Sequence, residues 1–290
     1  MKEKRMERRA PAVAGAFYEA SAEACRAHAE DLIAQAGGLP PDLPAPLGGV
    51  APHAGWVFSG ALAARTFAAM RAAQPQMFVL FGAVHRPASR RAQVYPGGAW
   101  ATPLGDVEVD AEAVRLAEEA GLDVSADNHE EEHSIEVQLP LIQVLFPQAR
   151  ILPVAVPHGP GAAETGARLA QALAAWPGRW VGVASTDLTH YGMGYGGPDL
   201  GPYAQAREWM RGNDARFIRL VETLDAEAMV DEAAARGNAC GAGAVAAAAA
   251  AARARGARRG VALQYATSAD VYPEPRASRA VGYLSAVFVP

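Results

Sequence analysis

The sequence predicts an α/β protein whose central sheet is largely parallel or mixed and is flanked by helices. Short apolar runs alternate along the chain with longer helical patterns, which is typical of strands joined by helical crossovers. Two interior runs, MFVLFG at 77–82 and WVGVAS at 180–185, are almost continuously apolar. Strands covered by helices on both faces have this composition, because neither face meets water.

The individual elements follow from the same patterns. Strands are expected at residues 47–51, 77–82, 150–156, 180–185, 261–266 and 280–289. Helices are expected at residues 22–35, 59–72, 111–120, 134–146, 161–175, 204–223, 226–235 and 241–255. Ser59 and Ser134 are suitable N-cap residues for two of these helices. Pro140 should kink or bound the helix that contains it.

One domain over residues 1–290 is expected, because no repeat or clean boundary interrupts the pattern. Residues 1–10 hold five Lys or Arg against two Glu and lack an apolar segment, so they indicate a flexible basic terminus rather than a signal peptide. Residues 39–46 (LPPDLPAP) indicate an extended linker into the first core strand. Residues 86–101 and 192–203 are rich in Gly and Pro, which is typical of binding loops or lids.

Composition disfavours several classes of protein. The chain has 290 residues, of which 51% are hydrophobic and 20% are charged, an ordinary globular balance. Its formal net charge of −5 gives no reason to expect nucleic acid as a partner. No uncharged apolar run reaches about 18 residues, so no membrane association is expected. Two cysteines without a secretory signal predict no disulfide framework and a cytoplasmic location.

Three histidines follow predicted strands at the points where the strands end. They are His53 in APHAG, His85 in GAVH and His190 in DLTH. In α/β folds, ligands bind in the crevice outside the carboxyl ends of the strands. Imidazole groups brought together there would suit Fe, Cu, Zn or Ni. The alternative is that each histidine is a loop residue that bonds a backbone carbonyl.

Cys240 directly precedes Gly241 and an Ala-rich helical stretch. A thiol at a helix N-terminus is expected to have a lowered pKa, because the helix dipole favours the thiolate. A thiolate is a soft metal ligand or, beside a histidine base, a nucleophile. The alternative is a small buried residue.

The densest polar cluster is NHEEEHSIE at residues 128–136. His129 and His133 have the HExxH spacing of zinc metalloproteases, in which one helix presents both histidines to an ion. The flanking residues indicate a loop and a helix start, which disfavours that assignment. We instead expect His133 to contact substrate or act as an acid or base, with Glu132 and Glu136 at the helix start.

Taken together, the motifs resemble those of the Memo family, whose prokaryotic members are described as component B of the AmmeMemoRadiSam system. The resemblance covers nearly the whole chain. Any one motif is weak evidence, and the motifs are specific for the family only when they are taken together. The matching segments are PAVAGAFY at 11–18, PHAGWVFSG at 52–60, WATPLG at 100–105, EHSIEVQLP at 132–140, STDLTHYG at 185–192, Cys240-Gly241 and Gly282-Tyr283.

The resemblance implies a fold similar to that of the class III extradiol ring-cleaving dioxygenases, which use non-haem Fe(II). It implies metal ligands at His53, His85 and Cys240, and further pocket residues at Asp187 and His190. We expect His190 to act as a catalytic acid or base, with Asp187 orienting it.

This chain departs from the family pattern just before His85, where it has Gly82-Ala83-Val84 instead of the usual Gly-Pro-Ser. One hydroxyl that could tune the site is therefore missing. The implied third ligand is a thiolate, whereas the two-histidine iron oxygenases use a carboxylate. Because thiolate also suits Cu and Zn, Fe(II) is the favoured metal and Cu or Zn stays open.

Three functions remain open. The first is a metal-dependent oxidoreductase of the dioxygenase type that acts on an unknown small molecule. The second is a non-catalytic module that binds a peptide or partner in the same pocket. For Arg86, Arg90 and Arg91, solvated surface charges are the favoured interpretation, and anion contacts to such a ligand are the alternative. The third is a thiol hydrolase that uses Cys240. The resemblance also implies a radical S-adenosylmethionine enzyme and an Ammecr-type protein as partners.

Overall fold

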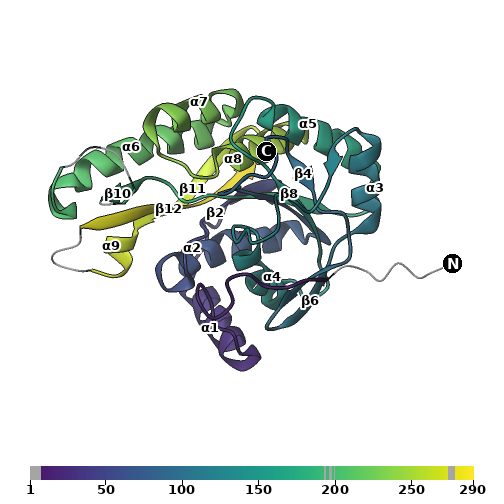
Figure 1. Cartoon of the computed structure of the whole chain (residues 1–290), viewed down its shortest axis with the longest axis horizontal. Helices are drawn as coiled ribbons and strands as arrows, with labels where there is room; N and C mark the ends of the chain where they lie inside the picture. The colour runs from purple at the N-terminus through teal and green to yellow at the C-terminus, as the bar shows by residue number, and fades with distance from the viewer. Residues whose placement is uncertain (1–7, 193, 196–197, 199, 274–277) are drawn as a thin grey trace.

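A computed structural model describes residues 8–192, 194–195, 198, 200–273 and 278–290. It confirms an α/β architecture in which helices flank a mixed sheet (Figure 1). At the centre of that sheet lie four parallel strands in the order β2 (Gly48–Ala51), β9 (Trp180–Ser185), β3 (Met77–Gly82) and β8 (Arg150–Ala155). All four carboxyl ends therefore meet at one edge, as the sequence predicts for ligand-bearing strands.

Antiparallel strands extend the sheet on both sides of this parallel centre. On one side, β12 (Arg279–Val289) pairs with β2, and both β10 (His190–Gly192) and β11 (Arg259–Thr267) pair with β12. On the other side, β4 (Gln93–Val94) pairs antiparallel with β8 and parallel with β7 (Asp123–Val124). The described part of the chain thus has a nine-stranded mixed sheet.

A small second sheet lies at the N-terminal side of the molecule. It contains β1 (Arg8–Arg9), β5 (Ala99–Thr102) and β6 (Gly105–Glu108). Of the terminus expected to be flexible, residues 1–7 lie outside the described residues. Arg8 and Arg9, in contrast, are held in β1, and Arg9 is anchored by buried Glu136.

Helices cover both faces of the main sheet (Figure 1). One face carries α1 (Ala22–Gln35), α2 (Trp56–Ala69) and α4 (Leu139–Leu145). On the other side of the sheet lie α3 (Ala111–Glu119), α5 (Ala162–Ala172), α6 (Tyr203–Thr223), α7 (Ala226–Arg236) and α8 (Ala242–Ala254). A short helix, α9 (Ser268–Val271), lies between β11 and β12. Among the described helices, none is long and apolar enough to cross a membrane.

The buried helix α8 packs directly on the parallel strands. Eleven consecutive residues, 242–252, are buried, and nine of them are alanine. Small side chains let α5 approach closely: a Cβ added to Gly166 would lie 1.8 Å from the carbonyl oxygen of Ala247. This tight packing fixes α8, and with it the position of Cys240 just before its start.

Both predicted N-caps are wrong. Helix α2 begins at Trp56 after Gly55, and the Ser59 hydroxyl instead donates to the Ala54 carbonyl at 3.1 Å. Ser134 lies in a turn, which a 3₁₀ segment over 136–138 connects to α4. Pro140 stands in the first turn of α4 and bounds that helix, as predicted, because proline needs no N–H there.

Candidate metal centre

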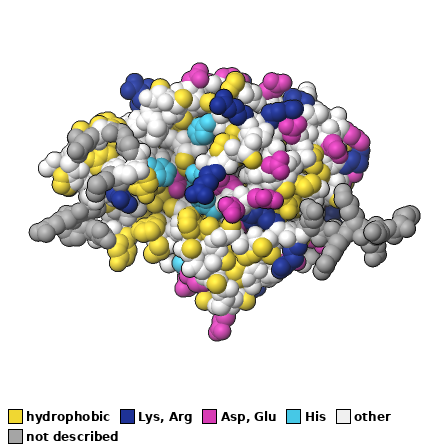
Figure 2. Space-filling view, viewed as in Figure 1, with side chains coloured by type: hydrophobic (Ala, Val, Ile, Leu, Met, Phe, Trp, Pro, Cys, Tyr) yellow, Lys and Arg dark blue, Asp and Glu magenta, His cyan; other side chains and the backbone are white. Residues whose placement is uncertain are grey.

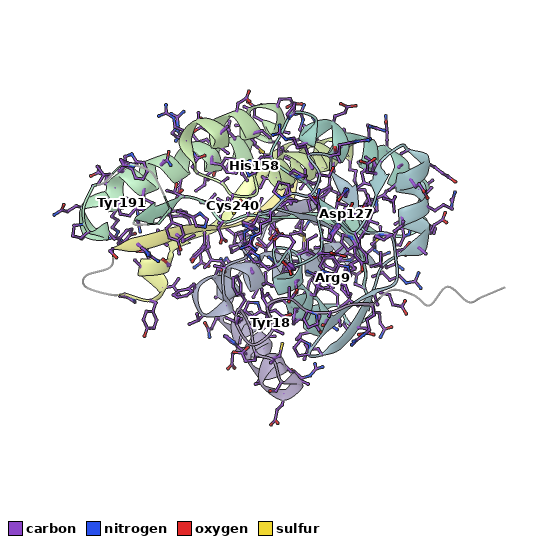
Figure 3. All side chains as sticks on the ribbon, in the orientation of Figure 1. Arg9, Tyr18, Asp127, His158, Tyr191 and Cys240 are labelled. Atoms are coloured by element: carbon purple, nitrogen blue, oxygen red, sulfur yellow. The ribbon has the colours of Figure 1, made fainter. Side chains whose placement is uncertain are left out.

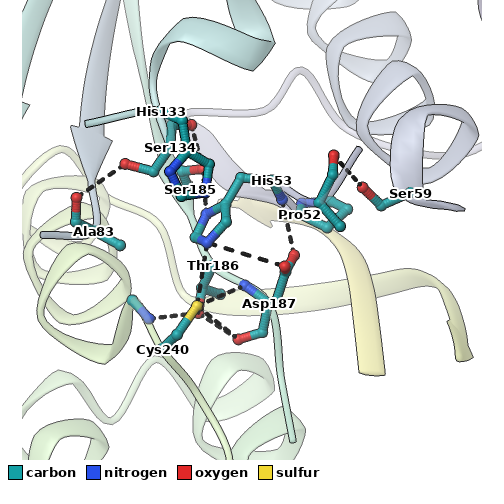
Figure 4. Close-up of polar contacts among 12 residues, drawn as sticks. Pro52, His53, Ser59, Ala83, His133, Ser134, Ser185, Thr186, Asp187 and Cys240 are labelled. Atoms are coloured by element: carbon teal, nitrogen blue, oxygen red, sulfur yellow. Dashed lines mark hydrogen bonds and ion pairs between the residues drawn. The ribbon is translucent and has the colours of Figure 1, made fainter. Parts of the chain in front are cut away.

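The structure brings together His53, His85 and Cys240. The two histidines follow β2 and β3, and the cysteine lies in the connection between α7 and α8. One ligand atom from each of the three lies within 4.8 Å of the other two. His53 Nε2 is 3.2 Å from Cys240 Sγ (Figure 4). Two imidazoles and a thiol at this spacing are a suitable donor set for one transition-metal ion.

His53 is held in the tautomer that a metal ligand needs. The Ser185 hydroxyl donates its one proton to the Ser134 carbonyl at 2.7 Å, so its oxygen accepts from His53 Nδ1 at 2.9 Å (Figure 4). The ring is therefore protonated at Nδ1 and presents its Nε2 lone pair to Cys240. Burial lowers the pKa of His53 well below its ordinary value, which keeps the ring neutral.

Cys240 is half-buried, and its surroundings affect the thiol differently from what the sequence suggests. Burial, with the charge of Asp187 as a further cause, raises the pKa of its thiol, whereas a helix N-terminus was expected to lower it. Helix α8 starts only at Ala242, and one N–H near the sulfur, that of Asp187, donates at 3.3 Å. A metal cation bound by these residues would supply the positive charge that holds this thiol as a thiolate.

His85 is supported by a carboxylate rather than by a hydroxyl. Glu132 accepts from the His85 backbone N–H at 2.8 Å and from Nδ1 at 3.1 Å. It also accepts from the backbone N–H groups of His133 and Ser134. Burial opposes ionisation, but these donors hold the pKa of Glu132 well below its usual range. Burial is the largest single influence on the pKa of His85 and lowers it. The hydrogen bond and charge of Glu132, together with the charge of Asp187, outweigh burial and raise the pKa overall.

His133 packs against both histidine ligands. Its ring stacks on that of His85 with centroids 4.7 Å apart and lies edge-on to that of His53 at 5.4 Å. His85, Glu132 and His133 also form a second group with ligand atoms within 4.8 Å. Because N–H donors already occupy the Glu132 oxygens, this group supports His85 rather than offering a second ion site.

Asp187 and His190 lie at the pocket, but they do not contact each other as expected. Asp187 accepts the backbone N–H of His53 at 2.8 Å, and burial raises the pKa of this carboxyl group to about 7. His190 Nδ1 donates to the Leu188 carbonyl at 3.0 Å, which leaves Nε2 unprotonated. Burial lowers the pKa of His190. Asp187 thus orients the His53 segment rather than the His190 ring.

Five of these side chains line one cavity of about 470 Å³, whereas Cys240 and Glu132 are not among its described lining residues. His53, His85, His133, Asp187 and His190 form its inner end. Figure 2 shows histidine side chains in a hollow of the surface, with a hydrophobic area beside it. A cavity of this volume, apolar with a few convergent polar groups, is typical of small-molecule sites.

An N-terminal segment closes one side of this cavity. Phe17 lines the cavity and packs edge-on against His133 at 4.8 Å. The buried Glu136 carboxylate fixes the segment by accepting from Arg9 at 2.8 Å and from the Tyr18 hydroxyl at 2.8 Å. Figure 3 shows Arg9 and Tyr18 on the side of the molecule that carries α1 and α4. Sequence spacing gave no sign of this contact, since the partners lie more than 100 residues apart.

The geometry does not support two hypotheses from the sequence: a zinc-protease pair of histidines and anion contacts from three arginines. His129 donates through Nε2 to the Gln93 carbonyl at 3.0 Å and lies within a turn, so it does not pair with His133 on one helix face as a zinc protease requires. Arg86, Arg90 and Arg91 are not among the described residues that line the cavity, and Arg91 pairs with Asp123.

Comparisons with known proteins show the family of this chain. A family model described as Memo-like protein matches residues 9–287. A MEMO1 family protein of Methanopyrus kandleri is 37% identical over 295 residues, which cover 97% of this chain and 98% of that protein. A MEMO1 family protein of Thermococcus kodakarensis is 36% identical, over 97% of this chain and 99% of its own. One from Thermotoga maritima is 33% identical with the same coverage.

Proposed function

This chain belongs to the Memo family, and from that premise we propose that it is a non-haem iron oxidoreductase of the dioxygenase type that acts on a small molecule. His53, His85 and Cys240 are the proposed ligands of one Fe(II) ion. The observation that carries the proposal is the convergence of two imidazoles and a thiol near the carboxyl ends of parallel strands.

The donor set limits the choice of metal. Imidazole and thiolate suit Fe, Cu and Zn, whereas Mg and Ca prefer oxygen ligands. We favour Fe(II), with Cu or Zn as the alternatives. When bound, such an ion supplies Lewis-acid chemistry and, for Fe or Cu, a redox centre. Ser185 and Glu132 orient the two imidazole rings toward it, as ligand-supporting groups do in metal sites.

The remaining pocket residues would bind substrate and move protons. His190 is the proposed general base, because its Nδ1 is held by Leu188 and its Nε2 is free to accept a proton. His133 is the second candidate, since it lines the cavity beside His85. Asp187 holds the backbone of His53 in place. Phe17 and the aromatic residues at the mouth would exclude water from a bound molecule.

The test is anaerobic reconstitution with Fe(II), followed by metal analysis and by O₂-consumption assays over a panel of phenolic compounds. We expect one ion per chain in the wild type and loss of stoichiometric binding in His53→Ala and in Cys240→Ser. The control is His129→Gln, which changes a buried histidine outside the cavity. Stoichiometric iron in His53→Ala would contradict the proposed ligand set.

The alternative function is a peptide- or partner-binding module that uses the same pocket without turnover. It requires affinity for a peptide that does not depend on metal, which calorimetry with and without a chelator measures. A thiol hydrolase, the third function considered, would lose activity on alkylation of Cys240 and keep it in the presence of a chelator. Co-purification tests the expected partners, a radical S-adenosylmethionine enzyme and an Ammecr-type protein.

A further inference from the structure

The mouth of the cavity differs in chemistry from its metal-binding end. Phe58, Tyr195 and Tyr272 line it, and their exposed fractions are 39%, 48% and 58%. Phe58 and Tyr272 lie edge-on with centroids 6.5 Å apart, and Tyr195 lies 5.1 Å from the ring of His190. Large aromatic side chains left exposed around a cavity indicate a surface that binds an apolar or flat ligand.

One cation stands among these aromatic rings. Among the described residues that line the cavity, Arg279 is the single Lys or Arg. It is exposed, lies 5.8 Å above the Tyr195 ring, and takes part in none of the ion pairs between described residues. Arg279 thus lines the cavity and pairs with no carboxylate among the described residues. A guanidinium binds planar carboxylates through two parallel hydrogen bonds.

The strand register gives the separation between this cation and the inner end. In the antiparallel pair of β10 and β12, His190 lies opposite Val281, and Gly192 lies opposite Arg279. Arg279 and Val281 are two residues apart, so they face the same side, and both line the cavity. Arg279 therefore lies about 7 Å along the strand from the level of His190. That distance is close to the length of one aromatic ring with a short side chain.

The guanidinium of Arg279 distinguishes the outer end of the cavity from its inner end. The inner end is lined by histidines and by Asp187, whereas the outer end carries Arg279, which attracts an anionic group. We propose that Arg279 selects aromatic carboxylates, whose ring lies among Phe58, Tyr195 and Tyr272 and whose far end faces His190. This inference rests on the proposed function in one respect, namely that the end of the ligand facing His190 is the end that reacts.

The test compares an acid with its uncharged analogue. The probes are 3-(4-hydroxyphenyl)propanoate and its primary amide, titrated calorimetrically into the full chain both with and without metal. A hydrogen bond to a charged group contributes about 1.5 kcal/mol or more, so the wild type should prefer the acid at least about tenfold. Arg279→Gln should remove the preference, and Arg279→Lys should keep part of it. The matched control is Arg216→Gln, which changes an arginine that pairs with Glu232 outside the cavity.

Each other outcome overturns the inference. Equal binding of acid and amide to the wild type would do so, as would an undiminished preference in Arg279→Gln or no binding of either probe. If phenyl phosphate binds more tightly than the acid, the preferred ligand class is aromatic phosphates rather than aromatic carboxylates. If cyclohexanepropanoate binds as tightly as the aromatic acid, the site does not require an aromatic ring. If the acid preference persists in protein that binds no iron, the proposed function fails while this inference stands.

Discussion

The two histidine ligands lie in regions of the molecule that are built differently. His53 follows a central strand, is buried, and is oriented by the neutral hydroxyl of Ser185. The side chain of His85 is 38% exposed and is oriented by the charged carboxylate of Glu132. Electrostatics separate them further, since the pKa of His53 is lowered and that of His85 is raised.

The difference shows that the two histidine ligands of one site can be positioned by different kinds of contact. The His53 half takes its geometry from strand pairing and from the packed helix α8. The His85 half depends on the turn over 129–134, which is held by charged hydrogen bonds from distant parts of the chain. A carboxylate behind a histidine raises its basicity, so the two halves should respond differently to mutation and to pH.

The largest expected effect comes from removing Arg9, which holds the His85 half together. Arg9 donates to buried Glu136 and to the carbonyls of His129 and Glu132, and its side chain is 8% exposed. Arg9→Met leaves the Glu136 carboxylate buried without its cation, which should lower the free energy of unfolding by about 3–5 kcal/mol. Urea denaturation measures this. Adding Glu136→Gln should restore part of the loss, and no restoration would argue against an unpaired charge as the cause.

The next effect is a pH dependence to which His129, in the same half, contributes. Burial lowers the pKa of His129 to about 4, against 6.5 in the unfolded chain. The folded state therefore binds fewer protons between these values, so stability is complete above about pH 6.5 and falls as the pH drops toward 4, by up to about 3 kcal/mol. His129→Gln keeps a donor for the Gln93 carbonyl. Its unfolding free energy should change less than that of the wild type between about pH 7.5 and pH 5; equal changes would show that another group is responsible.

The smallest effect compares the two supporting side chains directly. Glu132→Gln replaces the charged acceptor of His85, and should weaken metal binding about 10- to 100-fold. Ser185→Ala removes the neutral acceptor of His53, and should weaken it about tenfold or less, since neutral hydrogen bonds are about half as strong. Competition with a chelator under anaerobic conditions measures both. Equal losses would mean that the two halves contribute alike.

Much of the fold was predictable because the central strands are short, apolar and covered on both faces. The strand boundaries at β3 and β9 and those of helix α1 agree with the predictions. Strands such as β4, β7 and β10 were missed, since two or three residues are too few to show a periodicity. The N-caps failed for another reason: Gly55 can start α2 without a side-chain bond, and Ser59 then lies within the helix.

The candidate site was predictable only in part. The sequence placed His53, His85 and His190 at strand ends and indicated Cys240 as a candidate thiolate. The resemblance joined Cys240 to His53 and His85 and added Asp187 to the pocket. The sequence could not assign Ser185 and Glu132 as the groups that orient the imidazole rings of the two histidine ligands. It also could not show Arg279 at the cavity mouth, because that contact depends on the pairing of β10 with β12.

The sequence by itself determined the α/β class, the family and the kinds of donor atom that meet. Hydrophobic patterning and motif spacing are local properties, so they can be read from the chain directly. The tertiary structure decided the protonation of each ligand, since tautomers and pKa values depend on burial and on partners far away in sequence. The thiol of Cys240 illustrates the difference: its place before a helix predicted a lowered pKa, and its burial in the folded protein raises it instead.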